Sequence, residues 1–400
     1  MKLKQSINFK ELIRLVPEKY LQELAVKTKV NHSVSKLTGE TMFCLFLYGL
    51  TSTKFVSLRI LEQIFNSPIF KLQKGSRETI RHSAIGERLR KMKVSFFQKI
   101  FESLASDPRV DLWLGSVEKR YIIRKIDSTI VNLSAELLRL GLKINQEKRD
   151  LKFTLDLTNS LPVNIQLFTN QTYASEDKAL PKVIETESES NLEKIEILLF
   201  DRGIHKIETY LKIAQTKNHY FITRLSGQSY EILGVHKKIK GRKSGDLILE
   251  SDQLIRFSSP RAKSQKNDKQ TYRLIIALNR KTNQRLQFLT NILFLNAAEI
   301  SKLYKSRWEI EVFFKFIKQQ LNFSHLVSRS RNGIKIMMYM TMIAAILIAL
   351  YKKINKVEGW TIAKMRFFQE MEMNIIETFF DELAPMFLNS KKISVLFNSS

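Results

Sequence analysis

Cysteine is almost missing from this sequence: the chain of 400 residues has one, Cys44. A single thiol cannot form an intrachain disulfide, and it cannot supply the several ligands of a Cys-rich zinc or iron–sulfur site. The six histidines show no ligand spacing of the HxxxH kind. These absences exclude disulfide scaffolds and make a Cys- or His-based metal site an unlikely basis for function.

Long apolar stretches are also lacking. The first residues, MKLKQSINFKELIRLV, contain no apolar run of the kind that a signal peptide needs. The most apolar run is Ile336–Leu350, which has 15 residues and falls short of the roughly 20 that span a bilayer. The sequence therefore predicts a buried helix in this segment and a soluble, intracellular protein without a membrane partner.

Acidic residues are few beside basic ones: 39 Asp and Glu stand against 66 Lys and Arg, for a net charge of +27. A field of this sign favours a polyanion, and for a globular chain nucleic acid is the first candidate. The hydrophobic content of 44% is enough to form real cores. The length suggests about two to four domains.

The first part of the chain, residues 1–115, has the pattern of a mostly helical domain. Its segment RETIRHSAIGERLRKMK is strongly basic, with Ser83 and Ser95 as expected helix N-caps. Short helices joined by a polar turn suit a helix-turn-helix unit that places one helix in the major groove of DNA. The alternative is a basic, solvated face of a helix bundle. On the first interpretation, the DNA contacts come from Arg81, Arg88, Arg90 and Lys91.

From residue 119 onward the pattern changes to strands alternating with helices, which predicts an α/β domain. Short strands and basic loops then indicate a β-rich insertion, after which helices return. The predicted segments are a helical DNA-binding domain (1–115), a catalytic domain in two parts (116–225 and 295–352), the β-rich insertion between them (226–294), and a helical C-terminal region (353–400).

Two aspartates follow apolar strands of the predicted sheet: Asp127 ends YIIRKID and Asp201 ends IEILLFD. In open α/β sheets, sites form outside the carboxyl ends of strands, so the two carboxylates meet if the strands are neighbours. Glu311 can supply a third. Three carboxylates suit hard cations such as Mg²⁺ or Mn²⁺, and two such ions about 3.5–4 Å apart catalyse phosphodiester chemistry. The alternative is that both aspartates only cap turns.

The segment 304–321, YKSRWEIEVFFKFIKQQL, reads as one helix with an unusual polar face. At about 100° per residue, four polar side chains share an arc of about 60° among bulky Phe and Ile residues. We call this set the polar stripe: Tyr304, Arg307, Glu311 and Lys318. The alternative is an ordinary surface pair of Arg307 with Glu311 at i,i+4.

The spacing of the polar stripe, Y-x2-R-x3-E-x6-K, resembles the signature of the YREK group of DDE transposases of bacterial insertion sequences. IDST around Asp127 and FDRG around Asp201 resemble the first and second acidic motifs of that group. The resemblance runs from about residue 119 to 350. It implies an α/β, ribonuclease-H-like catalytic domain interrupted by a β-rich insert, with a helical N-terminal DNA-binding domain and a helical C-terminal region.

The resemblance also implies a catalytic role for the acids and a DNA-binding role for the rest of the stripe. Asp127, Asp201 and Glu311 would bind two Mg²⁺ or Mn²⁺ ions. Tyr304, Arg307 and Lys318 would contact phosphates of the DNA. The insertion has no Trp that could stack on a base, but Trp308, beside Arg307, is available for base stacking.

The implied function is that of a cut-and-paste transposase in the bacterial cytoplasm, at the nucleoid. Its partners would be double-stranded DNA, as terminal inverted repeats and as target, and a second copy of the chain in a homodimeric complex. It would cleave DNA at the element ends and join the 3′ ends to the target. Two alternatives stay open: a stand-alone metal-dependent DNA nuclease, and a non-catalytic DNA-binding protein derived from a transposase.

Overall fold

The computed structural model describes residues 6–74, 78–114, 120–132, 142–145, 148–185, 194–225, 227–239, 241–258, 270–325 and 327–397. The chain divides into two compact units. We call Glu118–Lys315 the sheet unit, and Met1–Val117 together with Phe316–Ser400 the helical unit.

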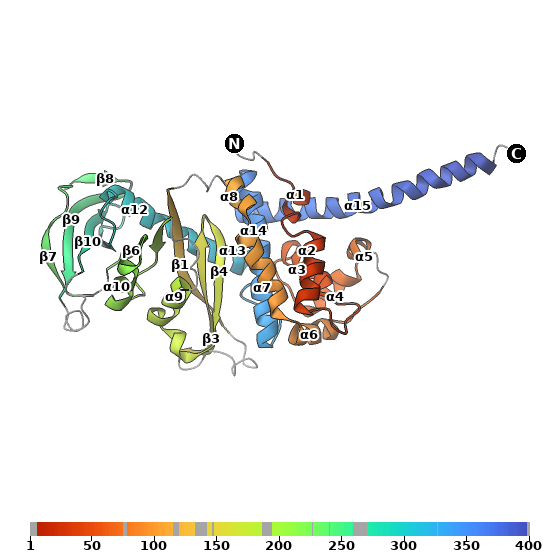
Figure 1. Cartoon of the computed structure of the whole chain (residues 1–400), viewed down its shortest axis with the longest axis horizontal. Helices are drawn as coiled ribbons and strands as arrows, with labels where there is room; N and C mark the ends of the chain where they lie inside the picture. The colour runs from red at the N-terminus through yellow and green to blue at the C-terminus, as the bar shows by residue number, and fades with distance from the viewer. Residues whose placement is uncertain are drawn as a thin grey trace. The chain divides into compact units, whose positions relative to one another are not determined.

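The sheet unit is built on one sheet of 11 strands, drawn as arrows in Figure 1. The strands are β1 (Tyr121–Asn132), β2 (Leu142–Asn145), β3 (Lys148–Thr158), β4 (Leu161–Phe168), β5 (Ile195–Leu199), β6 (His219–Arg224), β7 (Tyr230–Val235), β8 (Arg242–Ser244), β9 (Leu247–Phe257), β10 (Tyr272–Asn279) and β11 (Gln284–Thr290). The predicted α/β class is confirmed.

Three parallel strands, β1, β5 and β6, form the middle of the sheet. On one side β3 pairs antiparallel with β1, and β4 pairs with β3 through a turn at Asn159 and Ser160, both at positive φ. On the other side the order continues β11, β10, β9 and β7. The strands of segment 226–294 thus extend the same sheet. In place of the short strands expected in this segment, Leu247–Phe257 forms one strand of 11 residues, β9.

Helices cover both faces of this sheet because side chains alternate along each strand. On β5, Leu198 packs in a cluster with residues of α9 (Glu176–Glu185) and α10 (Ile207–Gln215). Its neighbour Leu199 packs in a second cluster with residues of α12 (Ala297–Ser306). Odd-numbered positions of β5 therefore face α12.

A buried ion pair ties the outer strands to the segment that leads into α12. Arg273 on β10 donates two hydrogen bonds to the carboxylate of Asp252 on β9, both of 2.7 Å. Its Nη1 also donates to the carbonyls of Ile292, at 3.1 Å, and Leu295, at 2.6 Å. Both charged side chains are fully buried. One guanidinium therefore fixes the backbone just before α12 begins.

The helical unit contains ten complete helices among the described residues. They are α1 (Phe9–Ile13), α2 (Glu18–Thr28), α3 (Gly39–Ser52), α4 (Leu58–Asn66), α5 (Pro68–Lys74), α6 (His82–Lys91), α7 (Val94–Ala105), α8 (Pro108–Leu114), α14 (Arg331–Ile354) and α15 (Trp360–Phe397). The predicted N-caps are wrong: Arg81 and Lys93 occupy the cap positions of α6 and α7, and neither makes a side-chain cap bond.

Helix α14 forms the core of this unit. It contains the apolar run Ile336–Leu350 but is longer, at 24 residues, and its length and composition alone would allow it to cross a membrane. The most apolar window is 89% buried, because α3, α6, α7 and α15 pack around it. It is the buried helix that the sequence predicts.

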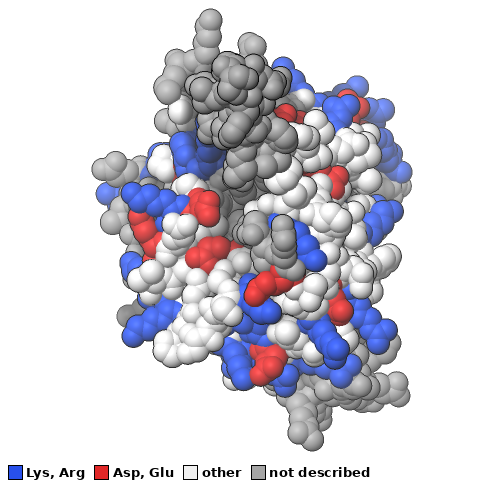
Figure 2. Space-filling model, turned by 90° about the vertical axis from the view of Figure 1, so that its right-hand side faces the viewer, with Lys and Arg blue, Asp and Glu red and all other residues white. Residues whose placement is uncertain are grey.

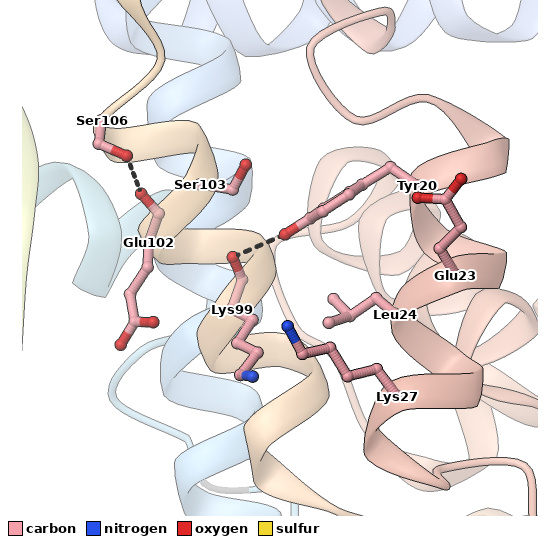
Figure 3. A pocket seen from close by; sticks show the side chains of 8 residues that line it. All are labelled: Tyr20, Glu23, Leu24, Lys27, Lys99, Glu102, Ser103 and Ser106. Carbon is pink, nitrogen blue, oxygen red and sulfur yellow. Dashed lines mark hydrogen bonds between the residues drawn. The ribbon is translucent and has the colours of Figure 1, made fainter.

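The N-terminal helices α2 and α7 are joined by a hydrogen bond from the Tyr20 hydroxyl to the Lys99 carbonyl, at 3.1 Å. A shallow hollow of about 360 Å³ lies beside this bond (Figure 3). Its lining mixes acids, Glu23 and Glu102, with bases, Lys27 and Lys99. With both signs of charge present, the hollow shows no preference for an anionic or a cationic ligand.

Replacing Arg273 with Met should destabilise the sheet unit, because the Asp252 carboxylate would stay buried without its partner. The expected loss is about 3–5 kcal/mol in the free energy of unfolding, measured by urea denaturation. Arg285→Met is the control, since Arg285 is 73% exposed and pairs with Glu250 at 3.0 Å; it should cost less than about 1 kcal/mol. Equal losses for the two variants would contradict the role given to Arg273.

Candidate active site

The pairing of β1 with β5 brings Asp127 and Asp201 to the same level of the sheet. The last residues paired across these parallel strands are Lys125 and Leu199, and each aspartate lies two positions further on. Adjacent strands are about 4.8 Å apart. Side chains alternate between the two faces of the sheet, and both aspartates are at positions whose side chains face α12. Asp127 is not at the end of its strand as predicted, because β1 continues to Asn132 along β3.

Two hydrogen bonds fix Asp201. The Tyr304 hydroxyl on α12 donates to its Oδ1 at 3.1 Å, and the Thr223 hydroxyl on β6 donates to its backbone carbonyl at 3.3 Å. Burial and the charge of Asp201 raise the pKa of Tyr304. The phenol therefore stays protonated and acts as a donor. In this way α12 reaches the carboxyl end of β5.

The predicted single helix over 304–321 is wrong in one detail: the chain forms α12 and then α13 (Trp308–Gln320), with Arg307 between them. At this junction the backbone bonds span three residues, from the Arg307 N–H to the Tyr304 carbonyl and from the Ile310 N–H to the Arg307 carbonyl, each at 3.0 Å. Such bonds are typical of a tightened turn. The guanidinium of Arg307 lies 5.5 Å from the centre of the Tyr304 ring and donates to Glu311 Oε1 at 2.8 Å.

Arg307 is the positive charge among the three predicted acids. Burial by itself lowers the pKa of Arg307, but the charge of Asp201 and the hydrogen bond and charge of Glu311 contribute to raising it above its usual value. Arg307 is only 8% exposed. Its partners come from β5, α12 and α13, which shows that the site is assembled from distant parts of the sequence.

The charges of Arg307 and Glu311 also affect the pKa of Asp127. The pKa of its carboxyl is raised to about 7, mainly by burial and in smaller part by the charges of Glu176 and Glu311. The Ser128 N–H, at 2.8 Å, and the charge of Arg307 act in the opposite direction. Asp127 therefore holds a proton near neutral pH until a positive charge approaches.

Three buried polar atoms of the Arg307–Glu311 pair have no hydrogen-bond partner in the described part of the chain: Arg307 Nε, Arg307 Nη1 and Glu311 Oε2. Leaving such atoms unpaired costs free energy. Two free donors suit an anionic oxygen, and a free carboxylate oxygen suits a cation.

A metal site is not preformed here: within the described ranges, no group of three or more His, Cys, Asp or Glu residues is arranged to hold an ion. The donors are nevertheless of the type that Mg²⁺ and Mn²⁺ prefer, because they are carboxylate oxygens. The unpartnered Glu311 Oε2 provides a further point of fit. The three acids thus match such an ion in donor type and in charge.

The sequence analysis missed Glu176, in the first turn of α9. It accepts a hydrogen bond from the Ser128 hydroxyl at 2.9 Å and pairs with Lys152 at 2.8 Å. A Cβ on Gly203, two residues after Asp201 in the DRG motif, would lie 3.0 Å from Cγ of Glu176. The sequence gives no signal that Glu176 contacts Ser128 near the predicted acids, since an acid in the first turn of a helix is common.

Two residues predicted to contact DNA remain: Trp308, beside the polar stripe, and Lys318, the last member of the stripe. Trp308 is 64% exposed and no described contact places it with the acids. Lys318 belongs to the helical unit, since α13 is divided between the two units at Phe316. Burial lowers the pKa of Lys318.

The four predicted DNA contacts of the helical unit have different environments. Arg88 is a structural residue, since it donates to the carbonyls of Leu37, at 2.8 Å, and Val30, at 2.5 Å. Lys91 is exposed and pairs with Glu87 at 2.7 Å. Arg81 and Arg90 are exposed. On the face drawn in Figure 2, basic side chains are spread widely, with acidic ones among them.

Comparison with known proteins identifies the family. Residues 126–347, more than half of the chain, match the family described as Transposase DDE domain. This stretch includes Asp127, Asp201 and Glu311. The chain therefore belongs to the family of DDE-domain transposases.

Similar proteins carry names from insertion sequences. A protein of Synechocystis sp., named as a transposase for insertion sequence element IS4SA, is 26% identical over 80% of this chain and 88% of its own length. One from Geobacillus stearothermophilus, named as a transposase for insertion sequence element IS5377, is 24% identical over 50% of each chain. The transposase y4zB of Sinorhizobium fredii is 28% identical over 40% of this chain and 43% of its own. The resemblance to transposases of insertion sequences is confirmed, and the YREK subgroup stays a prediction.

The raised pKa of Asp127 predicts how stability depends on pH. The folded value of about 7 lies above the value of about 3.9 for an unfolded chain. This group therefore stabilises the fold fully below about pH 4, and the stabilisation is lost as the pH rises through 7. Asn does not ionise, so Asp127→Asn should reduce the fall in melting temperature between about pH 5 and 8, measured in EDTA.

The control is Asp246→Asn, since Asp246 is an exposed acid paired with Lys281. Asp246→Asn should show the same fall in melting temperature between about pH 5 and 8 as the wild type. A fall in Asp127→Asn as steep as in the wild type would show that Asp127 does not hold the proton.

Proposed function

We propose that this chain is a cut-and-paste transposase: it binds the terminal inverted repeats of an insertion sequence, cleaves DNA at their ends and joins the 3′ ends to target DNA. The observation that carries the proposal is that Asp127 and Asp201 each lie two positions beyond Lys125 and Leu199, the last residues paired between the parallel strands β1 and β5. Glu311 joins them through Arg307. Membership of the transposase family supports DNA as the substrate.

We assign the catalytic domain to the ribonuclease-H-like type. Its support is the order β3, β1, β5 and β6, in which one antiparallel strand flanks three parallel ones. Helices α9 and α10 cover one face and α12 the other. On this assignment β7 to β11 are an insertion before the last acid.

In the proposed reaction Asp127, Asp201 and Glu311 would hold two Mg²⁺ or Mn²⁺ ions, and the chemistry that such ions would supply is activation of the attacking oxygen and stabilisation of the leaving one. Tyr304 orients the Asp201 carboxylate. Asp127 gives up its proton when the site gains positive charge, because its pKa of about 7 would then fall. Arg307 uses its free Nε and Nη1 to bind a phosphate oxygen beside the reacting bond.

The working complex proposed here is a homodimer that pairs two DNA ends in the bacterial cytoplasm, at the nucleoid. A stand-alone nuclease would share the same acids but would need no pairing of ends. A non-catalytic descendant would have no use for the three acids. Inverted repeats flanking the coding sequence would favour the transposase.

Alanine at Asp127, Asp201 or Glu311 should each abolish cleavage of end DNA, with at most a twofold change in binding (about 0.4 kcal/mol), because each loses a metal ligand and no DNA-reading group. The test is cleavage by purified variants under Mg²⁺ alongside a binding titration in Ca²⁺. Asp246→Ala removes an exposed acid of the same unit and should cleave like the wild type. Cleavage by any one of the three variants would remove that residue from the site.

Lys318→Ala tests the polar stripe by salt dependence. If Lys318 contacts a phosphate, the slope of log affinity against log salt should shrink by about 0.9 for duplex DNA, or about 0.7 for an open strand. Cleavage of bound DNA should fall further, since a shift of about 1 Å can cost roughly 100-fold in rate. Lys302→Ala, an exposed lysine on α12, is the control. Wild-type slope and rate in Lys318→Ala would contradict the contact.

A further inference from the structure

The helical unit contains a groove that the proposed chemistry does not use. It lies between the start of α4, the helix α6 and the segment 322–330, with a volume of about 940 Å³. We call it the α4–α6 groove. All its lining residues belong to the helical unit.

We propose that the α4–α6 groove binds an unpaired nucleotide of the DNA, its phosphate against arginines and its base against the ring of Phe55. The inference deepens the proposed function, on which it rests for DNA as the substrate. Three features of the groove support it: the sign of its charge, its exposed rings and an unsatisfied amide.

The charge of the groove selects an anion. Its lining includes Arg59 and Arg90, and none of the described lining residues is acidic. Both arginines are exposed. Arginine suits phosphate because its planar fork donates two parallel hydrogen bonds. His82 also lines the groove but is engaged by Glu62 at 2.8 Å, so the arginines provide the positive charge.

The rings select a base. Phe55 is 64% exposed, so its ring is open to solvent. It meets His325 edge to face, with ring centres 5.4 Å apart. Both rings line the groove. Proteins that bind single strands combine such rings with a basic groove, because every base has a face that stacks.

An unsatisfied amide at the back of the groove points to a ligand with a hydrogen-bond donor. Asn322 is 3% exposed, and its Nδ2 donates to the carbonyls of Val56, at 3.0 Å, and His325, at 3.1 Å. These bonds fix the amide, so its Oδ1 is left buried and without a partner in the described structure. A base carries amino and ring N–H donors, whereas a phosphodiester carries none.

The test compares three DNA duplexes with full-length protein in Ca²⁺: one blunt, one with a short single-stranded extension of mixed sequence, and one with the same extension lacking its bases. Fluorescence anisotropy gives each affinity. The abasic extension keeps the phosphates. The ratio of the affinities for the extension with bases and the extension without them therefore measures the contribution of the bases alone. Wild-type protein should prefer the extension with bases by about tenfold.

Phe55→Ala should remove that preference and leave the affinity for blunt duplex within about twofold. Arg59→Ala with Arg90→Ala should weaken binding of both extensions by about tenfold or more. Matched controls are Phe380→Ala, at 62% exposure, and Arg14→Ala, exposed and outside the groove; both should behave like the wild type. Melting temperatures check that each variant is folded.

A wild-type preference that survives in Phe55→Ala would overturn the base site. A second result would also overturn the base site. If the arginine variant lost equal affinity for blunt and extended DNA, and the wild type showed no preference for bases, the groove would contact only the backbone of duplex DNA. A chain that binds none of the three DNAs contradicts the proposed function itself. A chain that cleaves ends but shows no base preference contradicts this inference alone.

Discussion

The Arg307 guanidinium is the charge on which the candidate site depends. The three carboxylates come from β1, from the position two residues beyond β5 and from α13, in a partly buried place where like charges repel and desolvation is costly. Arg307 offsets both effects, because it bonds to Glu311 and acts on Asp127 and Asp201. The same residue marks the junction of α12 and α13, so the position of the charge and the course of the backbone are linked.

The strands beyond the catalytic core have a defined connection to this site. Arg273 and Asp252 lie on β10 and β9, yet they hold the backbone at Ile292 and Leu295. That backbone leads directly into α12, whose Tyr304 bonds to the second aspartate. The outer part of the sheet therefore positions the helix that completes the site. This explains in physical terms why these strands extend the central sheet.

Local patterns in the sequence predicted much of this structure. Apolar strands leading to an aspartate and the polar face of segment 304–321 are local signals. The structure shows the i,i+4 pair of Arg307 with Glu311 that the alternative interpretation expects, and it also joins Tyr304 to Asp201. The parts that were missed depend on pairing across the chain. No local pattern says that β7 to β11 join the central sheet, that Glu176 reaches Ser128, or that the helix tightens at Arg307.

The central claim is that the three acids act through divalent cations on DNA. Its most direct test is cleavage of end DNA by the full-length protein with Mg²⁺, Mn²⁺, Ca²⁺ or EDTA, alongside binding of the same DNA. The account predicts cleavage with Mg²⁺ or Mn²⁺, and binding without cleavage in Ca²⁺, whose looser coordination is poor for an in-line displacement. Undiminished cleavage in EDTA would contradict it.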